Sequence, residues 1–375
     1  MPTPERSVIG WDIGGAHVKA CLMQRGEVVD VAQWACPLWQ GLDQLDPVLQ
    51  RARERWPSFA AAQHAVTMTG EMVDLFEHRE EGVRRIAERL SNRLATAWPV
   101  QFFAGDAGWC GPDEVARHWA GIASANWLAT ARHAARHAMA HANPVGGEGV
   151  LVDIGSTTTD LIAFGAGRVL TTSRTDAERL ASGELVYHGV VRTPLCAIAP
   201  RIDWRGATVN VMNEFFASAA DVYRLTVELD PSHDLYPAAD NADKALPATR
   251  RRLARMIGLD ERDAAPAEWL AFARSWRAAQ VAELAGQLRR VLTRHRLSAS
   301  AIIVSAGCGD FLAADIVAQA TKTPGPEAAA RCRAYGTDVA RVARVAQGAA
   351  HDLSRWAQVC APCVAVATLL AEERC

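Results

Sequence analysis

The chain has 375 residues, of which 50% are hydrophobic and 22% charged, and this length favours two domains. Its 40 basic and 42 acidic side chains nearly cancel to a formal charge of −2, so no large basic surface for nucleic acid is expected. The most apolar stretch, 359–371, is shorter than the roughly 18 residues of a membrane-spanning helix, and the N-terminus lacks the apolar region of a signal peptide. We therefore expect a cytoplasmic protein with no membrane partner.

The first half of the chain alternates short strands with helices. A strand at 7–11 leads into Asp12-Ile13-Gly14-Gly15, and two extended segments, 17–24 and 28–36, complete a β-meander. The periodicity then predicts helices at 41–55, 81–97, 112–120 and 122–141, with strands at 64–69 and 100–104. The glycine-rich segment 143–149 is the clearest linker.

The opening pattern recurs directly after this linker. A strand at 150–152 leads into Asp153-Ile154-Gly155, and extended segments follow at 161–164 and 168–173. We interpret this recurrence as a domain duplication, with domains at 1–143 and 144–375. Further elements are predicted in the second half: strands at 185–191 and 301–304, helices at 211–228, 248–257, 265–294 and from 311, and a mostly helical tail, 339–372, that can return to the first domain.

The nine cysteines are too sparse for a disulfide scaffold. Cys360 and Cys363 have the spacing of a redox or metal pair, but no second pair or histidine cluster accompanies them. The apolar run 364–370 and Pro362 instead predict the first turn of a buried C-terminal helix.

Two glycine turns and a small-residue turn are the candidate phosphate sites. The first joins Asp12, Gly14, Gly15 and Lys19, where backbone N–H groups and an ammonium can surround phosphate and the acid can hold Mg²⁺. The second repeats the acid and the turn, and it adds hydroxyls: Asp153, Gly155, Ser156, Thr157 and Thr158. The third, with Gly307 and Gly309, ends a strand before a helix and permits close approach of a nucleotide or similar flat group.

These three turns, in this order, resemble the actin, sugar kinase and Hsp70 ATPase superfamily. The resemblance covers essentially the whole chain. It implies an α/β protein with two ribonuclease-H-like domains and a cleft between them, and it leaves ATP or ADP binding open. Superfamily membership alone does not decide function.

More specific segments narrow the resemblance. They are Thr67-Met68-Thr69-Gly70-Glu71, Gly105-Asp106-Ala107-Gly108-Trp109, Ala125-Asn126-Trp127, Ser182-Gly183-Glu184-Leu185-Val186-Tyr187-His188-Gly189 with Arg192 beyond it, and Met212-Asn213-Glu214-Phe215-Phe216. Together they resemble the hydantoinase/oxoprolinase-like proteins of tetrahydromethanopterin-linked one-carbon metabolism in methylotrophic bacteria, whose archaeal relatives are methanofuran synthases. The resemblance implies that a furan-methyl diphosphate condenses with the phenol of γ-glutamyltyramine or a tyrosine-like acceptor, forming an aryl ether and releasing diphosphate.

That reaction assigns expected roles to residues. Asp12 and Asp153 would hold Mg²⁺, while Lys19 and the hydroxyls of the second turn would bind diphosphate. The base that activates the phenol stays open among four carboxyls at strand ends: Glu71, Asp74, Asp106 and Asp160. Trp109 and Trp127 can stack on the substrate rings or pack in the core, Asn126 lies beside them in sequence, and Arg192 can bind a carboxylate.

Two other functions stay open at this stage. The first is an ATP-dependent small-molecule kinase or hydantoinase-like enzyme, although the sequence shows no aspartate in a recognisable sugar-binding motif. The second is an ATP-binding regulator or assembly protein, but Asp12 comes too early for a preceding helix-turn-helix domain of the repressor type.

Overall fold

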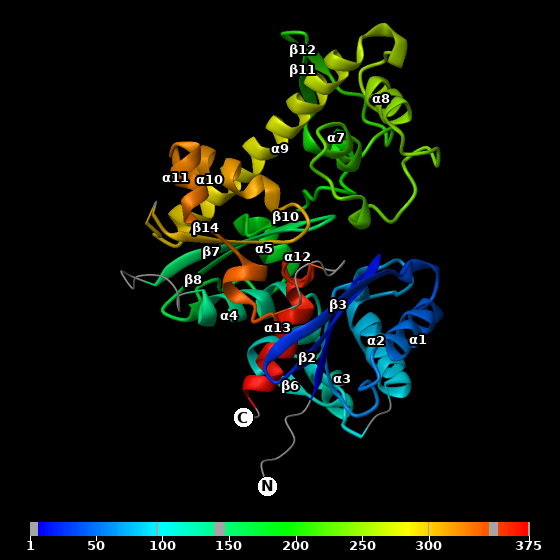
Figure 1. Ribbon diagram of the computed structural model, residues 1–375, viewed down its shortest axis with the longest axis vertical. Helices are drawn as coiled ribbons and strands as arrows, with labels where there is room; N and C mark the ends of the chain where they lie inside the picture. The colour runs from blue at the N-terminus through cyan, green and yellow to red at the C-terminus, as the bar shows by residue number, and fades with distance from the viewer. Residues whose placement is uncertain (1–6, 95–96, 139–146, 299, 345–351, 374–375) are drawn as a thin grey trace. The chain divides into compact units, whose positions relative to one another are not determined.

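A computed structural model describes residues 7–94, 97–138, 147–298, 300–344 and 352–373 (Figure 1). The chain divides into two compact units. Unit 1 comprises Met1–Gly147, Phe164–Asp176 and Arg333–Cys375, and unit 2 comprises Glu148–Ala163 and Ala177–Cys332. The predicted boundary at 143/144 lies outside the described residues. The C-terminal segment therefore belongs to the same unit as the N-terminal strands.

Unit 1 is built on a six-stranded sheet with the order β3-β2-β1-β4-β5-β6. The predicted meander is present, and the two predicted strands after it lie beside it. The strands are β1 (Val8–Ile13), β2 (His17–Gln24), β3 (Glu27–Ala35), β4 (Gln63–Met68), β5 (Gln101–Phe103) and β6 (Trp109–Cys110). β4 runs parallel to β1, and β2 runs antiparallel to it, with Lys19 directly opposite Asp12.

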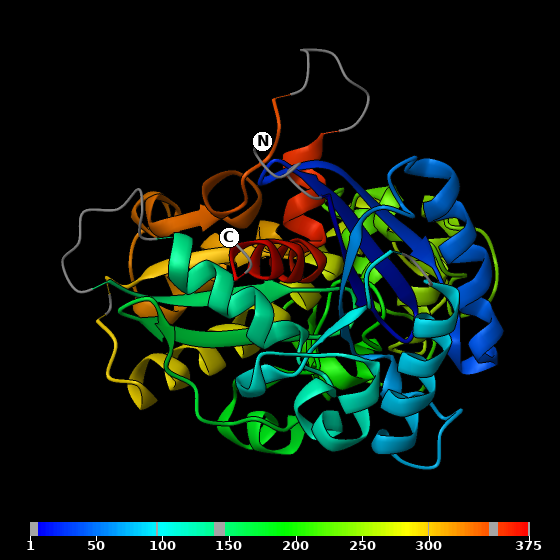
Figure 2. The same ribbon diagram turned by 90° about the horizontal axis from the view of Figure 1, so that it is seen from below.

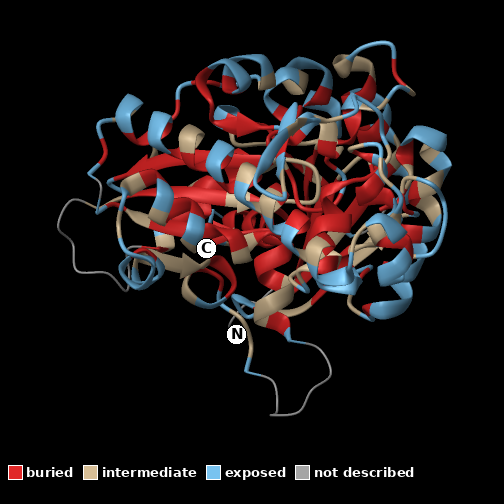
Figure 3. Ribbon diagram, turned by 90° about the horizontal axis from the view of Figure 1, so that it is seen from above, coloured by how far each residue is buried: buried red, intermediate tan, exposed pale blue. Residues whose placement is uncertain are grey.

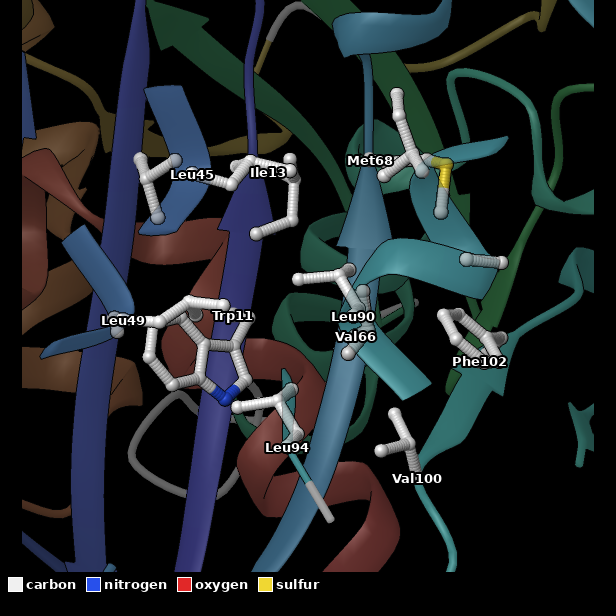
Figure 4. Packing of buried hydrophobic residues seen from close by; sticks show 14 of the residues in the cluster. Trp11, Ile13, Leu45, Leu49, Val66, Met68, Leu90, Leu94, Val100 and Phe102 are labelled. Carbon is white, nitrogen blue, oxygen red and sulfur yellow. The ribbon is translucent and has the colours of Figure 1, made fainter. Parts of the chain in front are cut away.

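One face of this sheet carries the main hydrophobic core of unit 1. Trp11, Ile13, Val66 and Phe102 project from the strands toward apolar side chains of α1 (Leu45–Arg55) and α2 (Arg79–Arg93), as Figure 4 shows. Alternation along β1 explains the arrangement, because Trp11 and Ile13 share one face while Gly10 and Asp12 share the other. Figure 3 shows the strands as predominantly buried.

The other face of the unit 1 sheet packs against the C-terminal helix. α12 (Leu353–Val359) is followed by α13 (Ala361–Glu372), which contacts β1, β2 and β4 (Figure 2). Gly10 permits this contact, because a Cβ there would lie 2.0 Å from the carbonyl oxygen of Cys363. Cys360 and Cys363 are fully buried free thiols, which confirms the predicted buried helix.

No single helix in the described ranges is long and apolar enough to cross a membrane, although α12 and α13, bent by 97°, pass that test as a pair on length and composition.

Unit 1 also contains α3 (Val115–Ile122) and α4 (Asn126–His137), shorter than the predicted 112–120 and 122–141.

Unit 2 repeats the meander and adds a parallel strand. Most of the second sheet belongs to this unit, and its order is β10-β8-β7-β13-β14, with β9, a strand of unit 1, paired to the end of β8. The strands are β7 (Glu148–Ile154), β8 (Thr159–Gly165), β9 (Arg168–Val169), β10 (Leu185–Val186), β13 (Ile302–Ala306) and β14 (Cys332–Ala334). The predicted strand at 185–191 is therefore only two residues long. The fold class is confirmed as α/β with two ribonuclease-H-like sheets.

The helices of unit 2 match the predictions where they are long. α9 (Pro266–Arg294) reproduces the predicted 265–294, while α5 (Asp176–Ser182), α8 (Leu246–Arg255), α10 (Ala313–Thr321) and α11 (Gly325–Arg331) accompany it. The predicted helix 211–228 is wrong in its first half. α7 (Ala219–Leu225) begins only after Ser218, whose N–H donates to Oδ2 of Asp221 in the first turn at 3.1 Å.

A short hairpin in unit 2 was missed by the sequence analysis. It joins β11 (Arg201–Trp204) to β12 (Ala207–Asn210) after the single turn of α6 (Leu195–Ile198). Its two-residue loop, Arg205-Gly206, has φ angles of 54° and 79°. Two positive φ values match the twist of a tight hairpin, but only the second residue of this pair is the usual glycine.

Candidate functional site

The first glycine turn begins at Asp12, at the end of β1. The N–H of Gly14 donates to the carbonyl oxygen of His17 at 2.9 Å, and a Cβ on Gly14 would lie 2.7 Å from that same oxygen. The turn is therefore closed by its own backbone, and only glycine fits at this position. Asp12 is 6% exposed.

Lys19 lies opposite Asp12 on β2, and its ammonium already has a structural partner. Its Nζ donates to the carbonyl oxygen of Val359, the last residue of α12, at 3.2 Å. A cation at a helix C-terminus is favourable because the unsatisfied carbonyls there carry partial negative charge. A contact between Lys19 and phosphate stays a prediction.

The segment after β4 packs directly on the first glycine turn. The N–H of Thr69 donates to the carbonyl oxygen of Ile13 at 2.9 Å, and a Cβ on Gly70 would lie 3.2 Å from that oxygen. On Gly15, a Cβ would meet Cγ1 of Val73 at 2.8 Å. These contacts place the backbone of the segment 69–73 against the first turn, whereas a Cβ on Gly82 of α2 would lie 2.8 Å from Cβ of Glu71.

Glu71 is an enclosed carboxyl with two partners on one oxygen. The side chain is 1% exposed, and Oε1 accepts a hydrogen bond from Oγ of Ser124 at 2.7 Å and from Arg79 at 3.3 Å. Its Oε2 is also buried and has no hydrogen-bond partner among the described residues. Burial raises the pKa of Glu71, and the hydrogen bonds from Ser124 and from the backbone of Glu71 itself, together with the charge of Arg79, partly oppose that rise.

Asp106 has the opposite environment. It follows β5, is exposed, and pairs with Arg132 at 2.5 Å and with Arg174 at 2.6 Å. The hydrogen bond from Arg174, together with the charges of both guanidinium groups, lowers the pKa of Asp106. A carboxylate stabilised in this way is a poor proton acceptor. Asp74, also in unit 1, is exposed.

The predicted aromatic and amide contacts of unit 1 have packing partners. Trp109 packs edge-on against Phe103 with ring centroids 5.5 Å apart, and Trp127 is 2% exposed in the core. Asn126 begins α4, where its Oδ1 accepts from the N–H of Trp127 at 2.8 Å. Their roles in substrate binding stay predictions.

The second glycine turn, in unit 2, is held by the segment 188–193. Gly155 N–H closes the turn on the carbonyl oxygen of Thr158 at 2.8 Å. The oxygen of Ser156 accepts from the N–H groups of Val191 and Arg192 at 3.1 and 2.8 Å. Gly189 lies so close that a Cβ would come within 2.3 Å of the nitrogen of Thr157. The hydroxyl-bearing side chains at 156–158 stay half-buried, so a ligand can reach them.

The small-residue turn after β13 meets the second glycine turn. A Cβ on Gly307, whose φ is +85°, would lie 2.2 Å from the carbonyl oxygen of Ile154 and 2.6 Å from Oδ1 of Asp153. Gly309 N–H donates to the same oxygen of Ile154 at 2.8 Å. The structure thus brings together Asp153 and the two predicted turns of unit 2.

The remaining candidates in unit 2 differ in burial. Asp160, on β8, is buried in an ion pair with Arg179, whereas Arg192 is exposed. Sequence reasoning missed Gln280, whose side chain is hydrogen-bonded to the segment that holds the second turn. Nε2 of Gln280 donates to the oxygen of Gly189 at 3.0 Å, and its Oε1 accepts from the hydroxyl of Tyr223 at 2.8 Å. No local pattern links Gln280, in the middle of α9, to that turn.

The described side chains contain no group of three or more His, Cys, Asp or Glu placed to hold a metal ion. Mg²⁺ commonly uses only one or two carboxylates together with substrate phosphates. The single acid at each glycine turn, Asp12 or Asp153, has the oxygen donors that such an ion prefers.

Comparison with known proteins assigns the chain to a family. The hydantoinase/oxoprolinase family model matches residues 63–345, so the chain belongs to this family. It is 29% identical over 253 residues to the (4-{4-[2-(gamma-L-glutamylamino)ethyl]phenoxymethyl}furan-2-yl)methanamine synthase of Methanocaldococcus jannaschii, covering 68% of this chain and 72% of that enzyme. The synthase of the same name from Methanococcus vannielii is 28% identical, with 51% of this chain and 84% of that enzyme covered.

Among solved structures, a nucleotide-free acetone carboxylase is similar with a TM-score of 0.49 and 12% identity. The match covers 85% of this chain and 67% of that one.

Proposed function

We propose that this protein is an enzyme of methanofuran-type cofactor biosynthesis. It transfers an aminomethylfuran-methyl group from its diphosphate to the phenol oxygen of γ-glutamyltyramine or a tyrosine-like acceptor. The similarity to two archaeal synthases carries this proposal, because their name describes a product in which a phenol oxygen is joined to a furan-methyl carbon.

The reaction forms one bond and breaks another. The phenol oxygen attacks the methylene carbon beside the furan, and the carbon–oxygen bond to diphosphate breaks, so diphosphate leaves with the bonding electron pair. The phenol proton must be removed, because a phenol near its ordinary pKa of about 10 is a weak nucleophile at neutral pH.

The candidate carboxyls differ in how well they could act as the base that takes the phenol proton. Glu71 is the best base, because burial raises the pKa of its carboxyl and one oxygen is left without a partner. Asp106 is less suited, because Arg174 and Arg132 lower its pKa, and Asp160 is less suited because its carboxyl is already engaged by Arg179. The glycine turns offer N–H groups and hydroxyls for diphosphate. Mg²⁺, carried by Asp12 or Asp153, would neutralise charge on the leaving group.

The test uses the full chain with Mg²⁺, γ-glutamyltyramine or tyrosine, and the furan diphosphate. Diphosphate release and the product mass are followed, and a parallel reaction contains ATP without the furan donor. We expect an ether product in the first reaction that is lost in Asp12→Ala. Acceptor-dependent ADP in the second reaction, with no ether in the first, would instead establish an ATP-dependent kinase or hydantoinase-like enzyme.

A further inference from the structure

Glu71 is held by two residues that come from different parts of unit 1. Ser124 lies between α3 and α4, and its hydroxyl donates to Oε1 of Glu71 at 2.7 Å across 53 positions of sequence. Arg79, the first residue of α2, donates to the same oxygen at 3.3 Å and to Oγ of Ser124 at 3.0 Å. Three side chains therefore form a closed cluster on one carboxyl oxygen.

The backbone at Ser124 adopts a conformation that costs free energy. Its φ is +49°, in the left-handed region that L-residues other than glycine, asparagine and aspartate seldom occupy. Such conformations persist where the surrounding structure requires them, and they concentrate at functional sites. Here the conformation accompanies a buried hydroxyl that points at Glu71, since Ser124 is 5% exposed.

The two carboxyl oxygens of Glu71 differ in their hydrogen bonds. Oε1 of Glu71 has both donors, whereas the buried Oε2 has no partner among the described residues. A buried acceptor without a partner is costly unless a water or ligand supplies a donor. The phenol hydroxyl of the acceptor substrate is a donor of the required kind.

We propose that Ser124 and Arg79 are positioning residues that fix Oε1 of Glu71 and thereby present Oε2 as the oxygen that takes the phenol proton. This inference rests on the proposed function and deepens it. The proton passes from the phenol to Oε2, the phenolate then displaces diphosphate, and the proton leaves to solvent after the product departs.

The charged groups around Glu71 determine how its titration responds. Arg79 of α2 is the cation beside it, and Arg79 also lies 3.7 Å from Asp176 at the start of α5. The third neighbour is neutral Ser124. Removing a hydrogen bond from an ionised carboxylate disfavours the ionised form, so loss of the Ser124 hydroxyl raises the carboxyl pKa further. The acid limb of the kcat profile then moves to higher pH.

The experiment compares two variants that both lack the Ser124 hydroxyl but differ in the backbone strain at this position. Ser124→Ala removes the hydroxyl and keeps a Cβ in the left-handed conformation, while Ser124→Gly removes the hydroxyl and relieves the strain. We expect both to move the acid limb of kcat upward by about one pH unit, the size expected for a lost hydrogen bond to a charged group. The KM for the furan diphosphate should change by less than about twofold, because the donor is bound by other groups.

Arg79→Lys and Arg79→Met provide a graded comparison, because lysine keeps the charge but not the fork of donors. The acid limb of the kcat profile should shift less in Arg79→Lys than in Arg79→Met. Ser91→Ala is the control for loss of a serine hydroxyl, since the hydroxyl of Ser91 donates within α2, to the oxygen of Ala87 at 2.7 Å.

A second readout separates this inference from the proposed function. The carboxyl band of Glu71, assigned by its disappearance in Glu71→Gln, is titrated by infrared difference spectroscopy without any substrate. Both Ser124 variants should raise its midpoint. A wild-type midpoint and a wild-type kcat profile in Ser124→Gly would overturn the positioning role and leave Ser124 as a purely structural residue. Failure of ether synthesis in the wild-type protein would instead overturn the proposed function.

Discussion

At the scale of single residues, the two most contrasting carboxyls of unit 1 are Glu71 and Asp106. Both follow strands of the same sheet, yet burial raises the pKa of Glu71 while Arg174 and Arg132 lower the pKa of Asp106. A base that must accept a phenol proton gains from the first environment and loses from the second. The sequence motif alone does not contain this difference.

Glu71→Gln should abolish ether formation and stabilise the fold at neutral pH. The raised pKa means that the native state keeps this proton to higher pH than the unfolded chain does. Between the two pKa values the native state binds more protons, so stability falls as pH rises through that window. Glutamine removes this loss, which amounts to about 1.4 kcal/mol for each unit of pKa elevation.

Thermal unfolding of wild-type and Glu71→Gln proteins between pH 4 and 8 measures the effect. The exposed Glu54 supplies the control, as Glu54→Gln should follow the wild-type curve. Parallel curves for wild type and Glu71→Gln would contradict a raised pKa at this position.

Gly307→Ala should damage the second glycine turn. The φ of +85° already disfavours a Cβ, and that Cβ would also lie 2.2 Å from the oxygen of Ile154. Gly167→Ala is a matched control, because Gly167 has φ of +73° and nothing within 4 Å of its Cβ position. We expect a loss of roughly 1–2 kcal/mol at Gly167 from strain alone and a larger loss at Gly307. Urea unfolding measures both, and equal losses would show that the close contact relaxes freely.

At the scale of elements, α9 supports the second glycine turn from behind. Gln280 is 1% exposed and joins Tyr223 of α7 to the backbone of Gly189, which in turn presses on Ser156 and Thr157. The long helix α9 thereby holds the loop at 188–193 in place, although no sequence pattern in the helix indicates this contact. Precise loops of this kind commonly depend on such supporting contacts.

Gln280→Leu should weaken binding of the furan diphosphate. The change leaves the Tyr223 hydroxyl and the Gly189 oxygen without their partner, at a cost of about 1–3 kcal/mol for each buried group. We expect the KM for the donor to rise by about tenfold, which corresponds to 1.4 kcal/mol. Gln287→Leu is the control, because Gln287 lies on the same helix and its amide donates to Glu283, one turn away, at 2.8 Å. An unchanged KM together with reduced stability would restrict Gln280 to a role in folding.

At the scale of the whole molecule, unit 1 is assembled from three separate stretches of chain. α13 covers the face of the sheet that carries Gly10 and Cys21, and Cys21 donates to the carbonyl oxygen of Cys363 at 3.3 Å. The end of the chain is therefore part of the same core as its first strand. The residues of unit 2, by contrast, end at Cys332, the first residue of β14.

Removal of residues 353–375 should selectively destabilise unit 1. Without α12 and α13, the apolar face of β1 and β2 is left open to water, and Lys19 loses the helix end that it contacts. Hydrogen exchange should then be fast at the β1 and β2 amides and slow at those of β13, which serve as the internal control. Retained protection in β1 would show that α13 is dispensable for this core.

The sequence predicted most of the fold because its signals are local. Alternating apolar residues predicted the strands of the first meander and the first two of the second, although the third, predicted at 168–173, is only Arg168–Val169. Asp-x-Gly spacing located both turns, and the long period of 265–294 located α9 almost to the residue. Predictions failed where the local signal was ambiguous. Residues 211–218 contain apolar residues at helical spacing, but the helix begins only at Ala219, after Asp221 has bound the N–H of Ser218.

The sequence by itself therefore determined the two glycine turns, their acids and the family resemblance, since these depend on residues close together along the chain. Only the tertiary structure decided that the backbone after β4 packs on the first turn, that Ser124 and Arg79 share one oxygen of Glu71, and that Gln280 supports the second turn. Burial and long-range hydrogen bonds set the pKa of a carboxyl, and neither is encoded in the few residues around it.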